Sequence, residues 1–141
     1  MSNLIPTHIK LHQTSRVLEI HFNNERNTPG GGGEIFKLPC ELLRVYSQSA
    51  EVTGHAPGQK VLQLDKQDVN IIDITPVGNY AIKLHFDDGH DTGIYTWERL
   101  YDLGNHQADY WTNYLRRLMR AGHSHPDLTK LKAVHGQSST D

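Results

Sequence analysis

Apolar and polar residues alternate strictly along residues 17–22, Val-Leu-Glu-Ile-His-Phe. A period of two is typical of a β-strand with one buried face. A polar segment with four consecutive glycines follows over residues 23–33, and residues 34–38 then have the pattern of a returning strand. The apolar side of the first strand consists of Leu18, Ile20 and Phe22.

The same pattern occurs again later in the chain. Residues 81–88, Ala-Ile-Lys-Leu-His-Phe-Asp-Asp, match residues 17–24, Val-Leu-Glu-Ile-His-Phe-Asn-Asn, in character at each position, and residues 94–100 correspond to residues 36–42. The offset is 64 positions in the first pair (85 − 21) and 58 in the second (100 − 42), which fits extra residues in the glycine-rich loop of the first copy. Neither copy can bury its apolar strand face alone, so we predict two strand–strand–short-helix units around one core. The second copy contributes Ile82, Leu84 and Phe86.

Shorter patterns predict the flanking elements. Residues 8–12 and 69–74 read as strands that precede the two copies. Pro39 suits the first turn of a short helix, because proline needs no amide partner there. This helix would carry Leu42, Leu43 and Tyr46.

A longer helix is predicted near the C-terminus. Gly104-Asn105 predicts a break followed by an N-cap, and Gly122 a helix stop. The apolar residues between them recur at helical spacing: Ala108, Trp111, Leu115, Leu118 and Met119. We therefore predict an α+β fold, mainly antiparallel β, with one domain over residues 1–122 and a flexible polar tail over residues 123–141.

Composition narrows the class of protein. The chain has 141 residues, 36% of them hydrophobic, and a formal net charge of −2. Such a balance gives no long-range attraction to nucleic acid or to an anionic membrane. The single cysteine excludes an internal disulfide, and no stretch has the length of a signal peptide or a membrane span. We expect a cytoplasmic protein that binds neither nucleic acid nor membrane.

Several residues that resemble catalytic or metal sites have simpler explanations. The glycine run at residues 30–33 lacks the Lys-Ser/Thr of a phosphate loop and is followed by Glu34, which favours a hairpin loop. His85 and Asp87 share a strand face as iron ligands do, but the first copy repeats the pattern, which favours a solvated face. Cys40 has no second cysteine nearby and is expected to be a small buried residue.

The ten histidines form no recognised metal motif, and no serine lies in a nucleophile elbow. His123-Ser-His125 could bind stray metal weakly, but its position in the tail favours solvation. We therefore expect no catalytic residues, no cofactor, and no enzyme activity.

The polar stretch over residues 43–55 has no regular period and allows two interpretations. It has small hydroxyls and ends in Gly-His, as loops that carry binding sites often do. It could equally be a capped turn in which Ser47 and Ser49 satisfy backbone amides.

Two stretches resemble the gamma-butyrobetaine hydroxylase-like N-terminal domain family. The first reads Leu38-Pro-x-Glu41-x-Leu43-Arg44, then Ser47-x-Ser49-Ala50-Glu51-Val52-x-Gly54-His55. The second reads Phe86-Asp-Asp-Gly-His90, then Tyr95-x-Trp97-x-x-Leu100. The resemblance covers about residues 7 to 121 and implies a compact, mainly β domain. The family occurs at the front of carnitine-pathway oxygenases, at the back of P-loop iron–sulfur ATPases, and as a free-standing short bacterial protein, which this chain resembles.

The resemblance also implies where a zinc site would lie. In the oxygenases this domain holds a structural zinc through three cysteines and one histidine. The cysteine positions fall here on Ser47, Ser49 and about Val52, and the histidine position falls on His90. Only the histidine is kept, and serine and valine are not zinc ligands, so we expect the family's zinc site to be absent.

The sequence thus predicts a non-catalytic accessory domain that binds a protein partner. The family settings imply a link to iron–sulfur or metal-protein maturation, with a P-loop iron–sulfur carrier as partner. The alternative is a metal-binding or metal-dependent redox protein that uses His90, His55 or Cys40. We expect an exposed partner-binding face near the Asp88–His90 turn, formed by Arg44, Ser47, Ser49, Glu51, His55 and His90.

Overall fold

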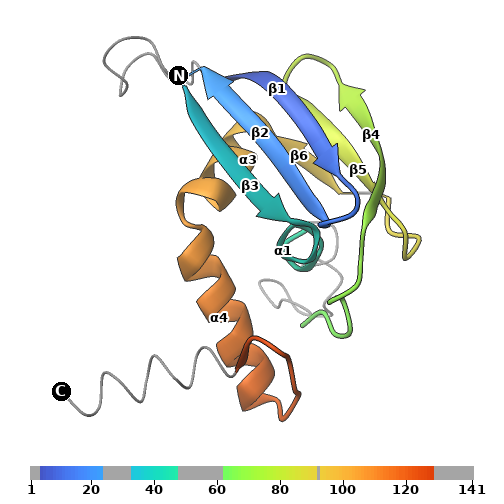
Figure 1. The fold of residues 1–141 in the computed structure, drawn as a ribbon, viewed down its shortest axis with the longest axis vertical. Coiled ribbons are helices and arrows are strands. Elements are labelled where there is room, and N and C mark those ends of the chain that lie inside the picture. The colour runs from blue at the N-terminus through green and yellow to red at the C-terminus, as the bar shows by residue number, and fades with distance from the viewer. Residues whose placement is uncertain (1–3, 24–32, 48–61, 92, 129–141) are drawn as a thin grey trace, which may run out of the picture. The chain divides into compact units, whose positions relative to one another are not determined.

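The computed structural model describes residues 4–23, 33–47, 62–91 and 93–128 (Figure 1). The chain divides into two compact units, Met1–Asn105 and His106–Asp141. The first unit holds both copies of the repeat, and the second begins just before the C-terminal helix. The repeat and the C-terminal helix therefore belong to different units.

The first unit contains two antiparallel sheets of three strands, as the α+β prediction requires. The first sheet has the order β1-β2-β3 and is followed by helix α1. The second has the order β4-β5-β6 and is followed by helix α3. The elements of the first half are β1 (Ile5–His12), β2 (Val17–Asn23), β3 (Glu34–Pro39) and α1 (Cys40–Val45). Those of the second half are β4 (Ile71–Val77), β5 (Ala81–Phe86), β6 (Ile94–Thr96) and α3 (Trp97–Asn105).

The predicted repeat is confirmed and extends further than the sequence pattern suggested. Each half is a β–β–β–α unit, and in each the first strand has a register shift at the same place. In β1 the shift lies at Thr7, opposite His21 and Phe22 of β2. In β4 it lies at Ile72, opposite His85 and Phe86 of β5. These two partner pairs are also 64 positions apart (85 − 21), so the bulge belongs to the repeated unit.

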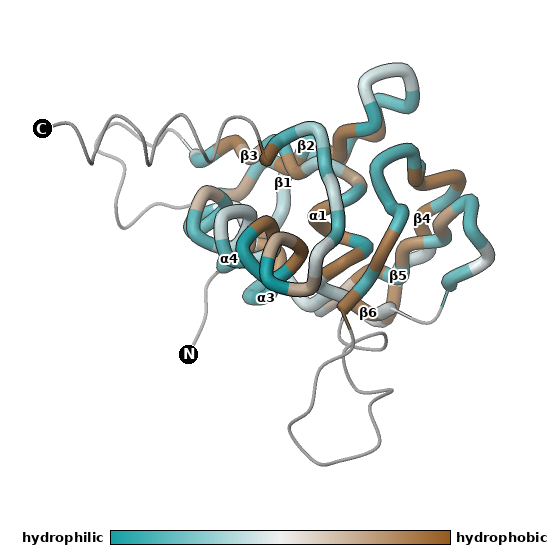
Figure 2. Tube along the Cα trace, turned by 90° about the horizontal axis from the view of Figure 1, so that it is seen from below, coloured by the Kyte–Doolittle hydropathy of each residue, from teal (hydrophilic) through white to brown (hydrophobic). Residues whose placement is uncertain are grey.

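The two apolar rows are buried, as predicted. The six side chains of Leu18, Ile20, Phe22, Ile82, Leu84 and Phe86 are between 0% and 3% exposed. The first sheet lies over β5 and β6 (Figure 1), and Figure 2 shows apolar stretches along the strands of both sheets and along α1. The halves are also joined directly, because the Tyr95 hydroxyl donates a hydrogen bond to the Leu43 carbonyl.

Helix α3 of the second half packs against the first half through aromatic rings. Tyr101 lies edge-on to Phe22 and Phe36, with ring centroids 5.5 and 5.3 Å away. A Cβ at Gly104 would lie 2.4 Å from Phe36 Cγ, so only glycine allows this approach. The break predicted at Gly104-Asn105 lies one residue later: α3 ends at Asn105, His106 is the N-cap residue of α4, and Gly104 serves packing.

The two short helices begin differently. The α1 N-cap residue is Pro39, which offers no side-chain bond; instead the Cys40 amide donates to the Arg16 carbonyl at 2.9 Å. Helix α3 has a side-chain cap, since the Thr96 hydroxyl accepts a hydrogen bond from the Arg99 amide at 3.1 Å. Threonine is a favoured N-cap for this reason.

Prolines occur in the outer strands of both sheets. Pro6 lies in β1, Pro39 ends β3, and Pro76 lies in β4. The strand predicted at residues 69–74 is found at Ile71–Val77, and it includes Pro76. Proline is tolerated there because an outer strand has one side without a partner strand.

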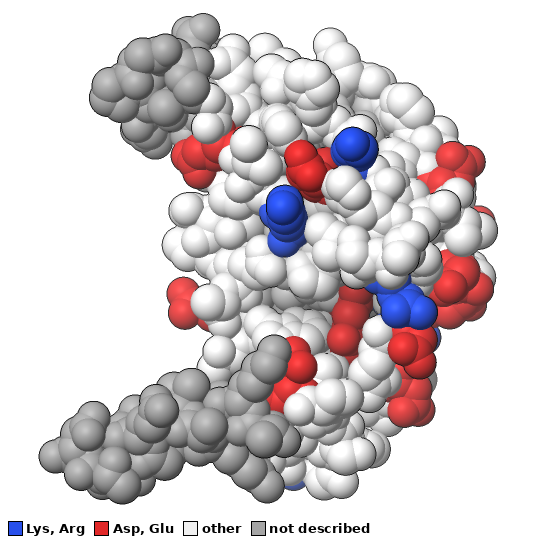
Figure 3. Space-filling view, in the orientation of Figure 1, with Lys and Arg blue, Asp and Glu red and all other residues white. Residues whose placement is uncertain are grey.

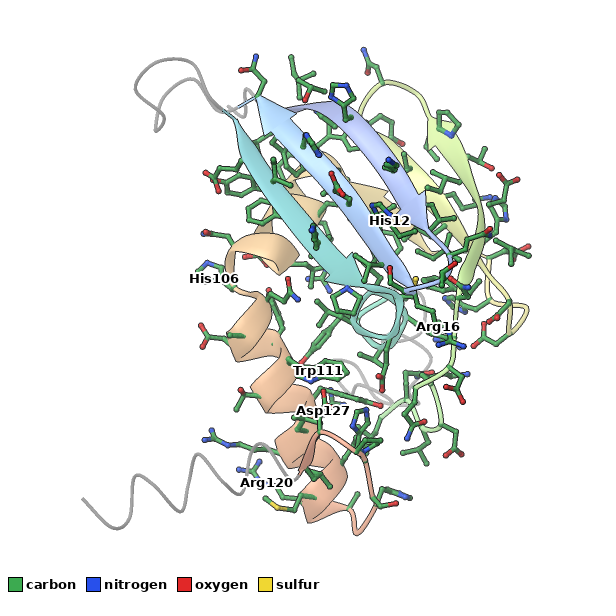
Figure 4. All side chains as sticks on the ribbon, viewed as in Figure 1. His12, Arg16, His106, Trp111, Arg120 and Asp127 are labelled. Atoms are coloured by element: carbon green, nitrogen blue, oxygen red, sulfur yellow. The ribbon has the colours of Figure 1, made fainter. Side chains whose placement is uncertain are left out.

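The second unit consists of α4 (Gln107–Arg120) and the segment after it. Gly122 has φ +81°, and the His123 amide bonds to the Leu118 carbonyl at 2.9 Å, which reverses the chain as expected for a glycine stop. Residues 123–128 differ from the flexible tail that we expected. His125 is only 8% exposed, and Trp111 Nε1 donates to Asp127 Oδ2 at 2.9 Å (Figure 4).

Candidate functional site

The end of α1 presents two polar side chains toward the turn between β5 and β6. Leu42 and Leu43 are fully buried and fix the orientation of this short helix. The Ser47 amide bonds back to the Arg44 carbonyl at 3.3 Å as the helix ends. Arg99 of α3 donates to the Tyr46 carbonyl at 2.8 Å and holds this end in place.

The turn after β5 is shaped by a glycine. Gly89 has φ +90°, a conformation that side-chain-bearing residues rarely adopt. Its amide bonds to the Phe86 carbonyl at 3.2 Å, and the His90 amide bonds to Asp88 Oδ1 at 3.1 Å. The turn therefore orients the side chains of Asp88 and His90 toward the end of α1.

Asp88 is the centre of an ion network that joins three segments. Its Oδ2 accepts hydrogen bonds from Arg44 Nε at 2.9 Å and from Lys66 Nζ at 2.7 Å. Arg44 also donates to Gln63 Oε1 at 3.2 Å. Burial alone would raise the pKa of Asp88, but the bonds from Lys66, the His90 amide and Arg44 outweigh it and lower the pKa to about 2. The carboxylate is therefore ionised at neutral pH.

A second contact lies beside this network. Ser47 Oγ and His90 Nε2 are 2.9 Å apart, and the Ser47 side chain is fully buried. Burial, and next the nearby Arg44 charge, lower the pKa of His90, so the neutral imidazole can accept a hydrogen bond from the Ser47 hydroxyl. A Cβ at Gly93 would lie 2.7 Å from Ser47 Oγ, so glycine is needed there for the hydroxyl to fit.

These residues do not fit the zinc site that the family resemblance implies. Two of its four positions, Ser47 and His90, are adjacent, and they contact each other through a direct hydrogen bond. A serine hydroxyl is not a zinc ligand of structural sites. In the described parts of the chain, no group of three His, Cys, Asp or Glu side chains is placed to hold a metal ion.

The described residues of the expected site are less exposed than predicted, but they lie close to the His90 turn, as predicted. Arg44 and Ser47 are 7% and 0% exposed, whereas we expected an exposed face. Ser49, Glu51 and His55 lie outside the described residues. The expected closeness of this stretch to the His90 turn is confirmed by the Arg44–Asp88 and Ser47–His90 contacts.

Two members of the network were not singled out from the sequence. Lys66 and Gln63 lie in a segment without a regular period, between Leu62 and Asn70. No local pattern could have identified them, because their partners are 22 and 19 positions away. Asp88 was visible only as part of the Asp-Asp-Gly-His motif.

The other candidate residues have structural partners. His85 Nε2 lies 2.7 Å from the Thr75 hydroxyl, and Asp87 Oδ1 accepts the Asn70 amide at 3.0 Å, so each contacts a different neighbour. Cys40 is buried, and this burial raises the pKa of its thiol to about 11. A protonated thiol is neither a good nucleophile nor a metal ligand.

Surface charge agrees with the small net charge of the chain. Acidic and basic side chains are interspersed on the face shown in Figure 3. Among the described residues, no helix has the length and apolar character needed to cross a bilayer.

The fold and site define a class: a small α+β domain of two β–β–β–α halves, with a polar, ion-paired junction between α1 and the β5–β6 turn. The family model described as gamma-butyrobetaine hydroxylase-like, N-terminal, matches residues 9–101. The chain belongs to this family, which confirms the resemblance noted in the sequence. No curated protein matches the chain.

Solved structures with related sequences agree with this assignment. Two proteins with NMR solution structures are 51% and 43% identical to this chain in sequence, with TM-scores of 0.70 and 0.69. They are matched over 87% and 86% of this chain, and over 86% and 89% of their own. A crystal structure of a protein of unknown function from Acidithiobacillus ferrooxidans, of the DUF971 family, is 34% identical with a TM-score of 0.53. That match covers 70% of this chain and 91% of the other.

Proposed function

We propose that this chain is a non-catalytic accessory domain of the cytoplasm that binds a protein partner at the junction between α1 and the β5–β6 turn. The observation that carries the proposal is that Arg44 and Lys66, from two other segments, both pair with Asp88. Charged groups that are already held in position lose little freedom on binding, and they favour a partner of complementary charge.

The exposure of the junction residues divides them into two roles. Arg44 and Ser47 are buried and hold the junction together, while His90 and Lys66 are partly exposed and can contact a partner. Ser49, Glu51 and His55 complete the proposed partner-binding set. The partner is a protein, and the family settings favour a P-loop iron–sulfur carrier, which would link the domain to metal-protein maturation.

The absence of catalysis is part of the same proposal. A serine beside a neutral histidine resembles a nucleophile and its base. The Ser47 hydroxyl, however, is fully buried, so a substrate could not reach it without opening the junction. This supports a structural use of the Ser47–His90 bond.

The proposal is tested by quantitative capture of partners from the native host. The bait is the full chain without a metal-binding tag, compared with the double variant Glu51→Gln and His55→Gln. These neutral substitutions keep side-chain size and remove one carboxylate and one imidazole. We expect at least one host protein to be captured about tenfold less by the variant, with a P-loop ATPase among those lost.

A matched control carries the same two changes elsewhere, at Glu98→Gln and His85→Gln. Both positions lie in the second half, on α3 and on β5. The control should capture the partner as well as the unmodified chain does. Equal capture by all three proteins would place the binding surface outside this junction.

A further inference from the structure

The outer face of the first sheet carries a group of histidines around one carboxylate. His8 and His12 lie on β1, and Glu19 and His21 lie on β2. Figure 4 labels His12 on this face, in front of the sheet. His8 is exposed, and the His12 and His21 side chains are 34% and 29% exposed, so solvent reaches the group.

His8 and His21 are directly opposed across the two strands. They are register partners in the β1–β2 pairing, immediately after the bulge at Thr7. Their ring centroids are 5.3 Å apart and the rings are tilted by 52°. Directly opposed side chains of an antiparallel pair have neighbouring Cβ atoms. Small rotations of two such imidazoles can bring one nitrogen of each within the ~2.0–2.1 Å at which zinc binds nitrogen.

Glu19 orients two of these imidazoles. Its carboxylate oxygens lie 2.5 Å from His21 Nε2 and 2.9 Å from His12 Nε2. An ionised carboxylate only accepts hydrogen bonds, so the imidazole nitrogen is the donor in both contacts. His21 therefore carries its proton on Nε2, which leaves the lone pair of Nδ1 available. A carboxylate that holds one imidazole nitrogen in this way makes the other a better metal ligand.

The second half of the molecule shows that the fold does not require this group. The positions that correspond to His8 and His21 are Asp73 and His85, which are also register partners next to the equivalent bulge. Lys83 occupies the position of Glu19 (19 + 64), and His85 contacts Thr75 instead. The second sheet thus has the same architecture as the first without a histidine pair or an orienting carboxylate.

We propose that His8 and His21 bind a divalent transition-metal ion, zinc or copper, on the outer face of the first sheet, with Glu19 orienting His21. Imidazole is a preferred ligand of both ions. No three potential ligands surround a common point among the described residues, so the two imidazoles are the protein's ligands and water fills the remaining positions. A site with open positions on the surface suits exchange of the ion with another molecule, and it is independent of the partner junction.

The experiment is a titration of the untagged, metal-free chain with zinc chloride, followed by NMR of the histidine side chains and by calorimetry. We expect one zinc ion per chain and selective changes at His8 and His21. The variants His21→Gln and His8→Gln should each bind at least about tenfold more weakly, while His85→Gln binds as the unmodified chain does. Glu19→Gln should weaken binding less than loss of either histidine. Backbone amide spectra establish that all four variants keep the fold.

The proposal is overturned if zinc does not bind at millimolar concentration, or if the His8 and His21 variants bind as tightly as the unmodified chain. It is equally overturned if His85→Gln weakens binding as much, or if the changes appear at His123 and His125 instead. In the last two cases the ion binds other histidines, without selection for the opposed pair.

Discussion

The two halves of the first unit share a framework and differ on its surfaces. Both have three antiparallel strands, a bulge in the first strand, a buried apolar row in the second, and a helix after the third. They differ in the outer sheet faces, in the start of the helix, and in the segment after the helix. Features that both halves keep are explained by packing, so features that only one half carries are the better guide to function.

The junction around Asp88 illustrates the difference. It depends on the Asp88–His90 turn of the second half and on Arg44 and Ser47 from the first. The histidine face, in contrast, belongs to the first half alone. One half therefore supplies the proposed metal site, while both together form the proposed partner junction.

The largest expected effect comes from the shared core. Ile20 and Leu84 are fully buried and occupy equivalent positions, 64 apart. Ile20→Ala and Leu84→Ala should each lower the free energy of unfolding by about 3 kcal/mol, because each leaves a cavity in the core. Urea unfolding should show one transition for both halves in each variant. Amide exchange that opens one half while the other stays protected would contradict the shared core.

The next effect tests the junction. Arg44→Met should lower the free energy of unfolding by about 2 kcal/mol. The cost is below that of a fully buried pair because Asp88 is partly exposed and keeps Lys66. Lys66→Met is the matched control and should cost less than about 1 kcal/mol, as for a more exposed ion pair. Equal losses in urea unfolding would show that Arg44 does not anchor the junction.

The two helix starts offer a smaller test. Thr96→Ala removes the side-chain cap of α3 and should cost about 1 kcal/mol. Pro39→Ala removes no such bond from α1 and should cost about 0.5 kcal/mol, mainly through a more flexible unfolded chain. Thermal unfolding of both variants gives the comparison. A larger loss at Pro39 would mean that α1 depends on its proline more than α3 on its cap.

A still smaller effect concerns how the stability depends on pH through His90, in the turn after β5. The folded chain lowers the pKa of His90 below its ordinary value of 6.5, so the unfolded chain takes up the proton first. The stability that this imidazole contributes is present above about pH 6.5 and is lost as the pH falls below it. Urea unfolding between about pH 7 and 5 should show a shallower decline for His90→Gln. Asp88, with its pKa lowered from 3.8 to about 2, acts separately, below about pH 4. If the free energy of unfolding depends on pH in the same way for both proteins, proton uptake by His90 is not coupled to unfolding.

The last prediction is that removal of metal has no effect on the stability of the fold. Two of the four positions at which the resemblance implies zinc ligands, Ser47 and His90, form a hydrogen bond with each other, so the fold should not depend on a metal there. EDTA should leave the melting temperature of the His8→Gln variant, which lacks the proposed surface site, unchanged. A clear fall would reveal a structural metal in this protein.

Local periodicity predicted most of the framework but little of the junction. The alternating rows at Leu18 and Ile82, the repeat, and the helix ending before Gly122 depend on contacts between near neighbours in the sequence. The Arg44–Asp88 pair joins residues 44 positions apart, and the family resemblance predicted only that the two stretches lie close together. A lone arginine in a polar stretch is ordinarily exposed, so its burial could not be anticipated. The burial of His125 was not predicted, because it comes from contacts with Trp111 and Tyr114 that leave no periodic pattern in the sequence.

The prolines in the outer strands affect how the molecule behaves among copies of itself. Of the described edge strands, β1, β3 and β4 each contain a proline, and β6 has only three residues. A proline supplies no amide hydrogen for a further strand, and a very short edge offers little to pair with. Edge-to-edge addition of strands is therefore disfavoured at every described edge, which protects a two-sheet protein from aggregation and directs binding to the sheet faces and loops.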